Sequence, residues 1–185
     1  EILYRLKNHI LKYENKENKN NRIKNLLIFP LTTFTETGRS TIDAEISLYL
    51  DYLKSNVDRD NVSILVKPHP GSLDLKTDLL IDKLNKLNYK VINRNFIKNK
   101  VTNLPLNILP LEILCLLIVS KFNLSFNEIK LCINSNASLS TFYLFPEINF
   151  LEPFGAKLIS KHIHKGFVDK RLKQEEILIN RIFRN

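Results

Sequence analysis

The stretch NVSILVKPHPG, residues 61–71, joins a short apolar run to a turn that contains two prolines. Val62–Val66 has the length and composition of a strand that is buried on both faces, and Pro68 and Pro70 stop it. Strands buried on both faces are typical of parallel sheets, which helices cover on either side. The stretch therefore predicts an α/β fold with a rigid turn at the end of one strand.

Strand and helix patterns alternate on either side of this stretch. Further strands are predicted at Leu26–Phe29, Tyr89–Ile92, Ile129–Ile133 and Ile148–Leu151. Helices are predicted at about 40–53 and 75–87, at Leu111–Val119 and Ala137–Leu144, and from about Gln174, where Ile177, Leu178, Ile182 and Phe183 are apolar. Ser40 and Asp43 fit a capping box for the first helix. The alternation implies right-handed crossovers and a Rossmann-like α/β fold, a parallel sheet with helices on both faces.

One Rossmann-like domain is expected behind a short N-terminal segment. Residues 1–14 have an apolar stripe at helical spacing, and residues 14–25 are polar and rich in Asn and Lys. We therefore separate 1–25, a helix and a linker, from a domain at 26–185. The sequence contains no Met, even at position 1, which suggests a fragment or a processed chain and leaves room for further chain upstream.

The apolar runs and the cysteines favour a cytoplasmic setting. The longest apolar run, Ile113–Val119, is far shorter than the ~20 residues of a membrane-spanning helix. Charges throughout residues 1–11 argue against a signal peptide there. Cys115 and Cys132 form neither a zinc pattern nor a CxxC motif, as expected for core thiols in a reducing compartment.

The net charge of +9 comes from the two ends of the chain. Residues 1–25 carry seven basic and three acidic groups, residues 156–185 carry eight and three, and the middle is neutral. Basic ends suit nucleic acid, an anionic membrane surface or an anionic substrate, and they are as typical of solvated helix faces. No RNP-like or helix-turn-helix pattern accompanies the charge, so nucleic acid is not expected as a partner. Peripheral contact with an anionic inner membrane is the interpretation we carry forward, with solvated faces as the alternative.

The proline turn carries the sharpest candidate for chemistry. Each proline disfavours helical backbone at the residue before it, so Lys67 and His69 are held extended at the end of a strand. Ligands of such sheets bind at the carboxyl ends of the strands. An imidazole there can donate a hydrogen bond or a proton to a phosphate leaving group. The alternative is a rigid turn whose histidine only faces solvent.

Two further polar stretches are predicted at the same edge. Asn134, Ser135 and Ser138 lie between a predicted strand and a predicted helix, where such side chains bind phosphate together with exposed N–H groups. The same residue types are common N-caps. Pro110 opens the preceding helix and places Glu112 beside its N-terminus. That carboxylate could accept hydrogen bonds from a ribose diol, or be there because the helix dipole favours it.

A fourth loop, residues 32–38, surrounds Glu36 with hydroxyl-bearing side chains. The carboxylate could take the proton of an acceptor hydroxyl, or belong to an ordinary polar surface loop. No metal site is expected, because His162 and His164 would face different directions on a helix and no acidic or cysteine cluster is nearby. The glycine motifs of ATPases and of NAD enzymes do not occur.

These motifs together resemble the donor-binding half of bacterial GT-B sialyltransferases. The resemblance rests on Lys67-Pro68-His69-Pro70 after a strand, the Pro-x-Glu helix start at Pro110 and the serine-containing strand end, and it covers about residues 26–151. The families are the lipooligosaccharide sialyltransferases (glycosyltransferase family 52) and the capsule polysialyltransferases (family 38). These families tend to have adjacent serines where this chain has Asn134-Ser135.

The resemblance implies one half of a GT-B fold and an inverting transfer of sialic acid from CMP-sialic acid to a hydroxyl of a surface glycan, with no metal and no further cofactor. His69 would contact the donor phosphate and act as acid to the leaving nucleotide, while a carboxylate would take the acceptor proton. Glu36 is the candidate for that carboxylate in this chain. The donor would be bound by Lys67, Pro68, Pro70, Glu112, Asn134, Ser135 and Ser138. A complete GT-B enzyme has two such domains, so the acceptor domain is expected outside this chain or reduced to the N-terminal helix.

Two other functions remain open at this point. Another GT-B transferase could use a different nucleotide-linked donor, with a glucosyl or glycerophosphate group, because such enzymes also use His-Pro turns and basic surfaces. A non-catalytic module could instead dock nucleic acid through its basic ends. Binding of CMP against UDP or CDP separates the first alternative, and steeply salt-dependent binding of arbitrary nucleic acid identifies the second.

Overall fold

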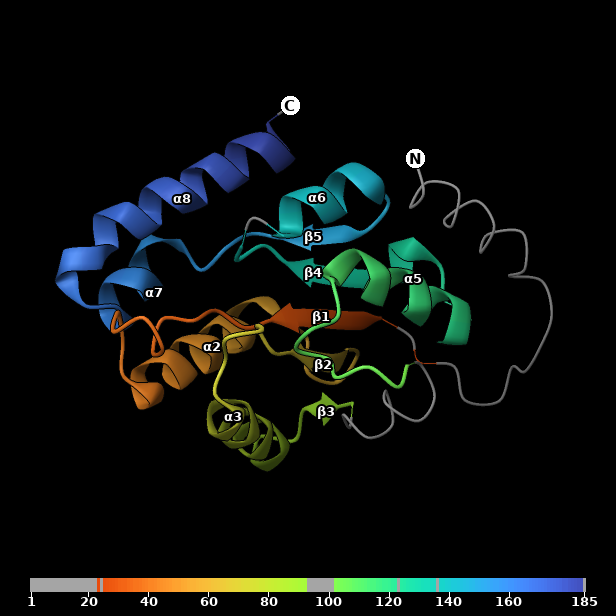
Figure 1. Ribbon diagram of the computed structural model, residues 1–185, viewed down its shortest axis with the longest axis horizontal. Coiled ribbons are helices and arrows are strands. Elements are labelled where there is room, and N and C mark those ends of the chain that lie inside the picture. Colours follow the sequence, from red (N-terminus) through yellow and green to blue (C-terminus); the bar gives the residue numbers. More distant parts are fainter. Residues whose placement is uncertain (1–22, 24, 93–101, 123, 136, 185) are drawn as a thin grey trace.

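Five parallel strands form one sheet in the order β3-β2-β1-β4-β5 (Figure 1). The computed structural model describes residues 23, 25–92, 102–122, 124–135 and 137–184. The helix predicted at 1–14 and nearly all of the linker lie outside the described residues. The strands are β1 (Leu26–Pro30), β2 (Ser63–Lys67), β3 (Lys90–Val91), β4 (Ile129–Cys132) and β5 (Asn149–Leu151).

Helices connect the strands and cover the sheet. They are α2 (Ile42–Asn56), α3 (Asp74–Lys86), α5 (Leu111–Phe122), α6 (Ala137–Leu144), α7 (Gly155–His162) and α8 (Lys165–Phe183), with a 3₁₀ turn, η2, at Phe126–Glu128. Every pair of neighbouring strands is parallel, so each connection crosses over through a helix or a long loop. The Rossmann-like α/β fold predicted from the sequence is confirmed.

Successive side chains of β1 pack alternately into two separate hydrophobic cores, one on each face of the sheet. Leu27 and Phe29 pack with α2, α3 and α7, whereas Leu26 and Ile28 pack with α5. All four side chains are fully buried. Burial of each such side chain stabilises the fold by roughly 1.5–3 kcal/mol. A strand with two buried faces explains why the sequence shows unbroken apolar runs here instead of an alternating pattern.

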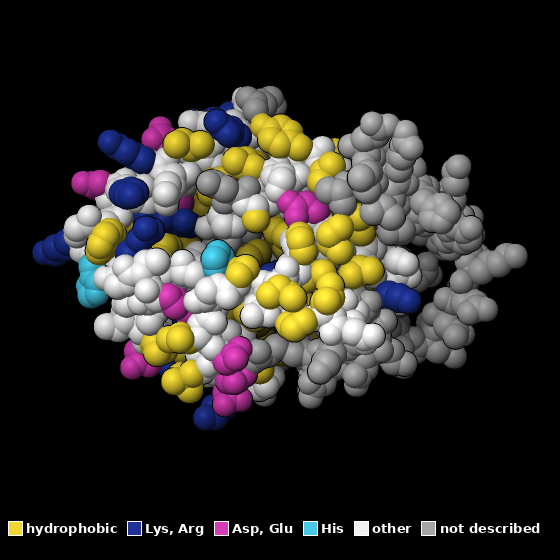
Figure 2. Space-filling model, viewed as in Figure 1, with side chains coloured by type: hydrophobic (Ala, Val, Ile, Leu, Met, Phe, Trp, Pro, Cys, Tyr) yellow, Lys and Arg dark blue, Asp and Glu magenta, His cyan; other side chains and the backbone are white. Residues whose placement is uncertain are grey.

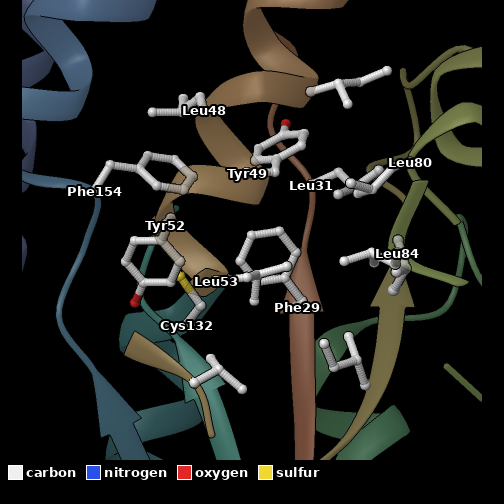
Figure 3. Close-up of a cluster of buried hydrophobic side chains, with 14 of the residues drawn as sticks. Phe29, Leu31, Leu48, Tyr49, Tyr52, Leu53, Leu80, Leu84, Cys132 and Phe154 are labelled. Carbon is white, nitrogen blue, oxygen red and sulfur yellow. The ribbon is translucent and has the colours of Figure 1, made fainter. Parts of the chain in front are cut away.

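Aromatic rings fill the core between β1 and α2 (Figure 3). The ring of Phe29 meets that of Tyr49 edge-on at 5.5 Å between centroids, and Tyr52 meets Phe154 in the same way at 5.3 Å. The Tyr52 hydroxyl donates to the carbonyl oxygen of Glu152 at 2.5 Å. These contacts hold the chain after β5 against α2, directly before α7 begins at Gly155.

The topological switch point lies between β1 and β4. Strand order runs 3-2-1 on one side of it and 4-5 on the other, and β1 pairs with both β2 and β4. In open α/β sheets the loops after the two central strands diverge at this point and leave a crevice at the carboxyl edge. The loops that follow β1 and β4 are the two polar loops that the sequence analysis singled out, at 32–40 and 134–138.

The start of α2 differs from the predicted capping box. Thr41, not Ser40, is the N-cap, and its hydroxyl accepts from the N–H of Ala44 at 3.2 Å. Ser40 donates instead to the carbonyl oxygen of His162 at 2.8 Å and ties this loop to the end of α7. The reciprocal Asp43 interaction of a capping box has no counterpart, because a cap at Thr41 moves the required position to Ala44.

The C-terminal part of the domain contains more helix than predicted. The sequence analysis did not predict α7, and α8 begins at Lys165 rather than near Gln174. The buried positions of α8 are Arg171, Glu175, Leu178 and Ile182, a helical stripe whose first half is an ion pair. A prediction from apolar residues alone detects only the second half of that stripe, Leu178 and Ile182. Ile177 and Phe183, also taken as apolar helix positions, are exposed.

Positively charged side chains gather over α7 and α8 in Figure 2, on the left of that view. These two helices carry most of the basic excess of the C-terminal segment. In the part of the chain that the structure describes, no helix combines the length and the apolar character that crossing a bilayer requires.

Candidate ligand-binding site

Two adjoining pockets open at the carboxyl edge of the sheet, beside the switch point. The larger pocket has a volume of about 480 Å³ and lies between the loop after β2 and the start of α5. The smaller pocket, about 170 Å³, lies between the loops after β1 and β4 and helix α8. Leu31, His69 and Ser135 line both pockets. His69 and Ser135 therefore stand where the two pockets meet.

The turn after β2 fixes the position and the tautomer of His69. Its Nδ1 accepts a hydrogen bond from the backbone N–H of Gly71 at 3.1 Å, and its carbonyl oxygen accepts from the N–H of Ser72 at 2.9 Å. A ring nitrogen that accepts a hydrogen bond carries no proton, so the neutral ring holds its proton on Nε2. The side chain of His69 thus presents an Nε2–H donor at the junction of the pockets.

The charge state of His69 follows from its surroundings. Desolvation, and then the positive charge of Lys67, lower the pKa of His69 from its ordinary value of 6.5, although the carboxylate of Glu36 acts in the opposite direction. At neutral pH the imidazole is therefore uncharged. It can stabilise a phosphate by donating a hydrogen bond, without first taking up a second proton.

Lys67, the last residue of β2, places a cation in the wall of the larger pocket. Its side chain is buried, and Nζ donates to the carbonyl oxygens of Pro68 at 2.9 Å and Asn107 at 3.3 Å. An ammonium group has three donors, so one remains for a ligand. Desolvation lowers the pKa of Lys67 to about 8, against the opposing effect of the Glu112 carboxylate. The amine is still mostly protonated at pH 7.

Glu112 lies in the first turn of α5 and also lines the larger pocket. Its carboxylate accepts a hydrogen bond from the hydroxyl of Ser140 on α6, which orients the side chain. A carboxylate has about four lone-pair sites, so capacity remains for the hydroxyls of a ligand. Apolar side chains, among them Ile108 and Leu111, form the adjacent wall, and Figure 2 shows hydrophobic side chains gathered over this part of the molecule.

The residues after β4 do not all reach the same pocket. Ser135 lines both pockets and Asn134 lines the smaller one, whereas Ser138 lines neither. The side chain of Asn134 is buried and donates from Nδ2 to the carbonyl oxygen of Pro30, while its Oδ1 has no partner among the described residues. The hydroxyl of Ser138 is likewise buried without a described partner.

The structure thus brings His69, Glu112 and Ser135 to one pocket, as the order of the polar loops predicted. Lys67, Pro68 and Pro70 line it as well. The sequence could locate these residues because each directly follows a buried strand or opens a helix at the same edge of the sheet.

Glu36 is arranged differently from the expected general base. It lines neither pocket. Its Oε2 accepts from Nζ of Lys76 at 2.8 Å, and its Oε1 accepts from the backbone N–H of Leu73 at 2.8 Å, beside the N-terminus of α3. Burial alone would raise the pKa of Glu36, but these two hydrogen bonds outweigh it and the pKa lies below the ordinary value. A carboxylate with bound oxygens and a lowered pKa is a weak base, and these contacts give Glu36 a structural role between the loop after β1 and α3.

A buried polar network, which the sequence analysis missed, holds the loop after β1 in place. Glu45 is fully buried in α2 and accepts from the hydroxyl of Thr32 at 2.8 Å, from the N–H of Thr35 at 2.7 Å and from Nζ of Lys76 at 3.1 Å. The hydroxyl of Tyr49 also donates to Glu45. Lys76, also fully buried, donates in addition to the carbonyl oxygen of Thr32 at 2.8 Å. The hydroxyl-rich loop is therefore fixed by charge-assisted hydrogen bonds, which are the stronger kind.

Two arginines that the sequence analysis did not single out line the smaller pocket. Arg39 comes from the loop before α2 and Arg171 from α8. The Arg171 guanidinium donates from Nε to Glu175 at 2.9 Å and from Nη1 to the carbonyl oxygen of Asn134 at 3.1 Å. Arg171 and Glu175 sit four residues apart in a stripe that is otherwise apolar, and that spacing is the one signal in the sequence that could have indicated them.

Comparison with known proteins adds no assignment. The chain matches no protein-family model, no curated protein and no solved structure. Within the described ranges, no group of three or more His, Cys, Asp or Glu side chains is arranged to hold a metal ion. The function proposed below rests on the geometry of the two pockets and on the motifs in the sequence.

Proposed function

We propose that this chain is the donor-binding domain of a GT-B glycosyltransferase that moves sialic acid from CMP-sialic acid to a hydroxyl of a surface glycan. The observation that carries the proposal is the position of His69, which stands between two pockets at the switch point of a Rossmann-like sheet. A nucleotide-linked sugar has the same layout, with a phosphate between two larger groups.

The larger pocket suits the nucleoside. Its apolar wall beside α5 can cover the base, and the oriented carboxylate of Glu112 can accept hydrogen bonds from the ribose hydroxyls. The free N–H of Lys67 and the hydroxyl of Ser135 would reach the phosphate, with His69 beside them. A phosphate at this junction leaves the smaller pocket for the sugar.

The transfer itself needs little covalent help from this domain. The bond between the anomeric carbon of the sugar and the phosphate oxygen breaks with its electron pair going to the phosphate, and the acceptor oxygen forms the new bond on the opposite face. The second pKa of a phosphate monoester is about 6, so CMP leaves as a stable dianion at neutral pH. Hydrogen bonds from Nε2–H of His69 and from Lys67 would offset the negative charge that develops on the phosphate. Such electrostatic stabilisation of the transition state is the largest catalytic contribution in many enzymes.

The base that takes the acceptor proton belongs, in this proposal, with the acceptor half of the enzyme. Among the described residues that line the two pockets, Glu112 is the sole carboxylate, and it is assigned to the ribose. Glu36 is already bound by Lys76 and Leu73. A GT-B enzyme closes two domains over its substrates, so a base on the second domain would complete this site.

The basic helices α7 and α8 support the second part of the proposal, a cytoplasmic enzyme that contacts the inner membrane and works on a glycolipid acceptor. Anionic headgroups attract each nearby Lys or Arg by roughly 1 kcal/mol, enough together for reversible docking. Sedimentation with anionic and with neutral vesicles tests this part. Equal binding to both kinds of vesicle would leave the basic residues as solvated faces.

Isothermal titration calorimetry with CMP, UMP and UDP tests the proposed donor. We expect CMP to bind more tightly than either uridine nucleotide, and Lys67→Met to weaken CMP at least tenfold. Lys54→Met, which removes an exposed lysine at the end of α2, is the matched control and should leave the affinity unchanged. Absence of CMP binding to the folded chain, or equal loss in both variants, would contradict the proposal.

A further inference from the structure

We propose that Arg39 and Arg171 form an anion-binding site in the smaller pocket, which receives a negatively charged group on the transferred part of the donor. The inference rests on the proposed function, because it takes the larger pocket as the place of the nucleoside. It adds the residues that would hold the negative charge of the transferred group, Arg39 and Arg171, which the sequence motifs do not assign.

The composition of the smaller pocket points to an anion. Arg39 and Arg171 both line it, and His69 adds a hydrogen-bond donor at its boundary. No Asp or Glu is among its described lining residues. Of the two arginines, only Arg171 has a counter-charge among the described residues, from Glu175, so a neutral sugar would leave the charge of Arg39 uncompensated. A carboxylate or a phosphate matches the planar, paired donors of the two guanidinium groups.

The guanidinium of Arg171 is buried and has one nitrogen without a hydrogen-bond partner among the described residues. Its side chain is 7% exposed, and two of its nitrogens are engaged by Glu175 and by the carbonyl oxygen of Asn134. The remaining nitrogen, Nη2, is buried and has no hydrogen-bond partner among the described residues. Buried donors of charged groups are normally paired, so an unpaired one on a pocket wall indicates a ligand that supplies the acceptor.

The guanidinium of Arg171 is also held rigidly. It lies over the rings of Phe34 and Phe154, at 5.2 and 5.6 Å from their centroids. Glu175 directs its other carboxylate oxygen to the N–H of Gly155 at 2.8 Å. Because the ion pair and the two rings fix Arg171 in advance, little side-chain entropy is lost when an anion binds.

Arg39 supplies the charge that Glu175 does not compensate. Its backbone is fixed on both sides, because its N–H donates to the carbonyl oxygen of Phe34 at 2.7 Å and its carbonyl oxygen accepts from His164 at 2.9 Å. Its guanidinium lies 5.7 Å from the ring centroid of Phe167, and no carboxylate in the described part of the chain pairs with it. The pocket therefore has one positive charge in excess.

A second unpaired group on the same pocket wall narrows the range of ligands that fit. Oδ1 of Asn134 is a buried acceptor with no described partner, and it suits a hydroxyl donor. Sugar acids and phosphorylated polyols are two classes of anion that also carry hydroxyls. The carboxylate of sialic acid and the phosphate of a transferred glycerophosphate share this chemistry, so the two sources are separated by experiment.

Calorimetry of CMP, CDP and CMP-sialic acid at pH 7.5 separates them. We expect CMP-sialic acid to bind at least tenfold more tightly than CMP, and this gain to disappear in Arg39→Gln while CMP affinity changes less than twofold. An Arg39-dependent gain with CDP and none with CMP-sialic acid assigns the site to phosphate. Arg59→Gln, which changes an exposed arginine away from both pockets, should retain the gain. A gain that persists in Arg39→Gln, or the absence of any gain, would overturn the anion site.

A second measurement tests the anion site without any nucleotide, and so applies even if CMP does not bind and the proposed function is wrong. Inorganic phosphate and acetate are titrated separately into ¹⁵N-labelled protein at constant ionic strength, and the Nε–H signals of Arg39, Arg171 and Arg59 are followed. Saturable shifts confined to Arg39 and Arg171 support the site, whereas equal shifts at Arg59 refute it. Because Arg171 is buried against Glu175, the double variant Arg171→Gln/Glu175→Gln, which removes both charges together, replaces the single substitution and should abolish the shift at Arg39.

Discussion

The backbone N–H of Gly71 donates a hydrogen bond to Nδ1 of His69, at 3.1 Å, and this contact decides what the histidine can do. It leaves the proton of the neutral ring on Nε2, the nitrogen that remains for a ligand. Two prolines hold the same turn at the end of β2, so the imidazole is positioned before any ligand binds. His69 is therefore suited to stabilise a leaving phosphate by hydrogen bonding from an uncharged ring.

Substitution of His69 separates hydrogen bonding from proton transfer. In His69→Gln the amide nitrogen can take the place of Nε2, so we expect a loss of no more than about tenfold in turnover of CMP-sialic acid by the complete enzyme. His69→Ala removes the donor, and the loss should be on the order of 10²–10⁴, the usual range for such a group. The measurement is kcat for release of CMP. Equal and large losses in both variants would show that His69 transfers a proton.

The pKa of Lys67 gives the nucleotide affinity a pH dependence. Below pH 8 the amine is protonated and attracts the phosphate, and as the pH rises through about 8 the charge on the free protein is lost. We expect the affinity for CMP to fall above pH 8 in the natural sequence. Lys67→Met, which keeps the length of the side chain without the charge, should bind CMP weakly with no further loss above that pH. Calorimetry between pH 6.5 and 9.5 measures both, and a steady affinity of the natural sequence across this range would refute the role of Lys67.

Glu36 is expected to affect stability and not catalysis. Glu36→Gln keeps an acceptor for the N–H of Leu73, whereas Glu36→Ala loses it together with the Lys76 contact, at a cost of about 1–3 kcal/mol in the free energy of unfolding. The lowered pKa of Glu36 adds stability above the unfolded pKa, and that stability is lost as the pH falls through the lower, folded pKa. Urea unfolding from pH 3 to 7 measures the difference, which should shrink at the acid end. CMP affinity that drops tenfold in Glu36→Gln would instead place the carboxylate in the binding site.

The buried pair Lys76 and Glu45 should behave as a unit. Lys76→Met leaves Glu45 charged inside the core, and breaking a buried pair in this way typically costs about 3–5 kcal/mol. Adding Glu45→Gln removes the stranded charge, so the double variant should be more stable than the single one. Urea unfolding of the natural sequence, both single variants and the double variant gives the coupling energy. Additive losses would mean that the two side chains act independently.

The fold was predictable because its signals are local. The three central strands, β1, β2 and β4, are mainly apolar runs with a proline or polar residues behind them. The proline pair at 68 and 70 marks the edge where the site lies. Such features depend on neighbours in the sequence and need no knowledge of packing. His69, Glu112 and Ser135 could be placed together for the same reason.

The parts that were missed depend on contacts between distant residues. Arg171 reaches the carbonyl oxygen of Asn134, 37 residues away, only because α8 packs beside the loop after β4. Glu36 and Lys76 are 40 residues apart in the sequence. Their ion pair ties Glu36, which the sequence suggested as a base, to the start of α3. No pattern within α8 or within the loop after β1 encodes these neighbours, so only the packed structure reveals them.

Nitrogen NMR of the histidines, with CMP as the probe, tests the central claim most directly. The claim is that His69 holds the phosphate of a cytidine nucleotide through Nε2–H, and His162 and His164, which line neither pocket, serve as internal controls. On titration with CMP at pH 7.5 we predict a saturable shift at Nε2 of His69, with the protonated Nε2 form retained and the two control histidines unchanged. Unchanged His69 signals in the presence of bound CMP, or equal shifts at His69 and at the two control histidines, would contradict the account.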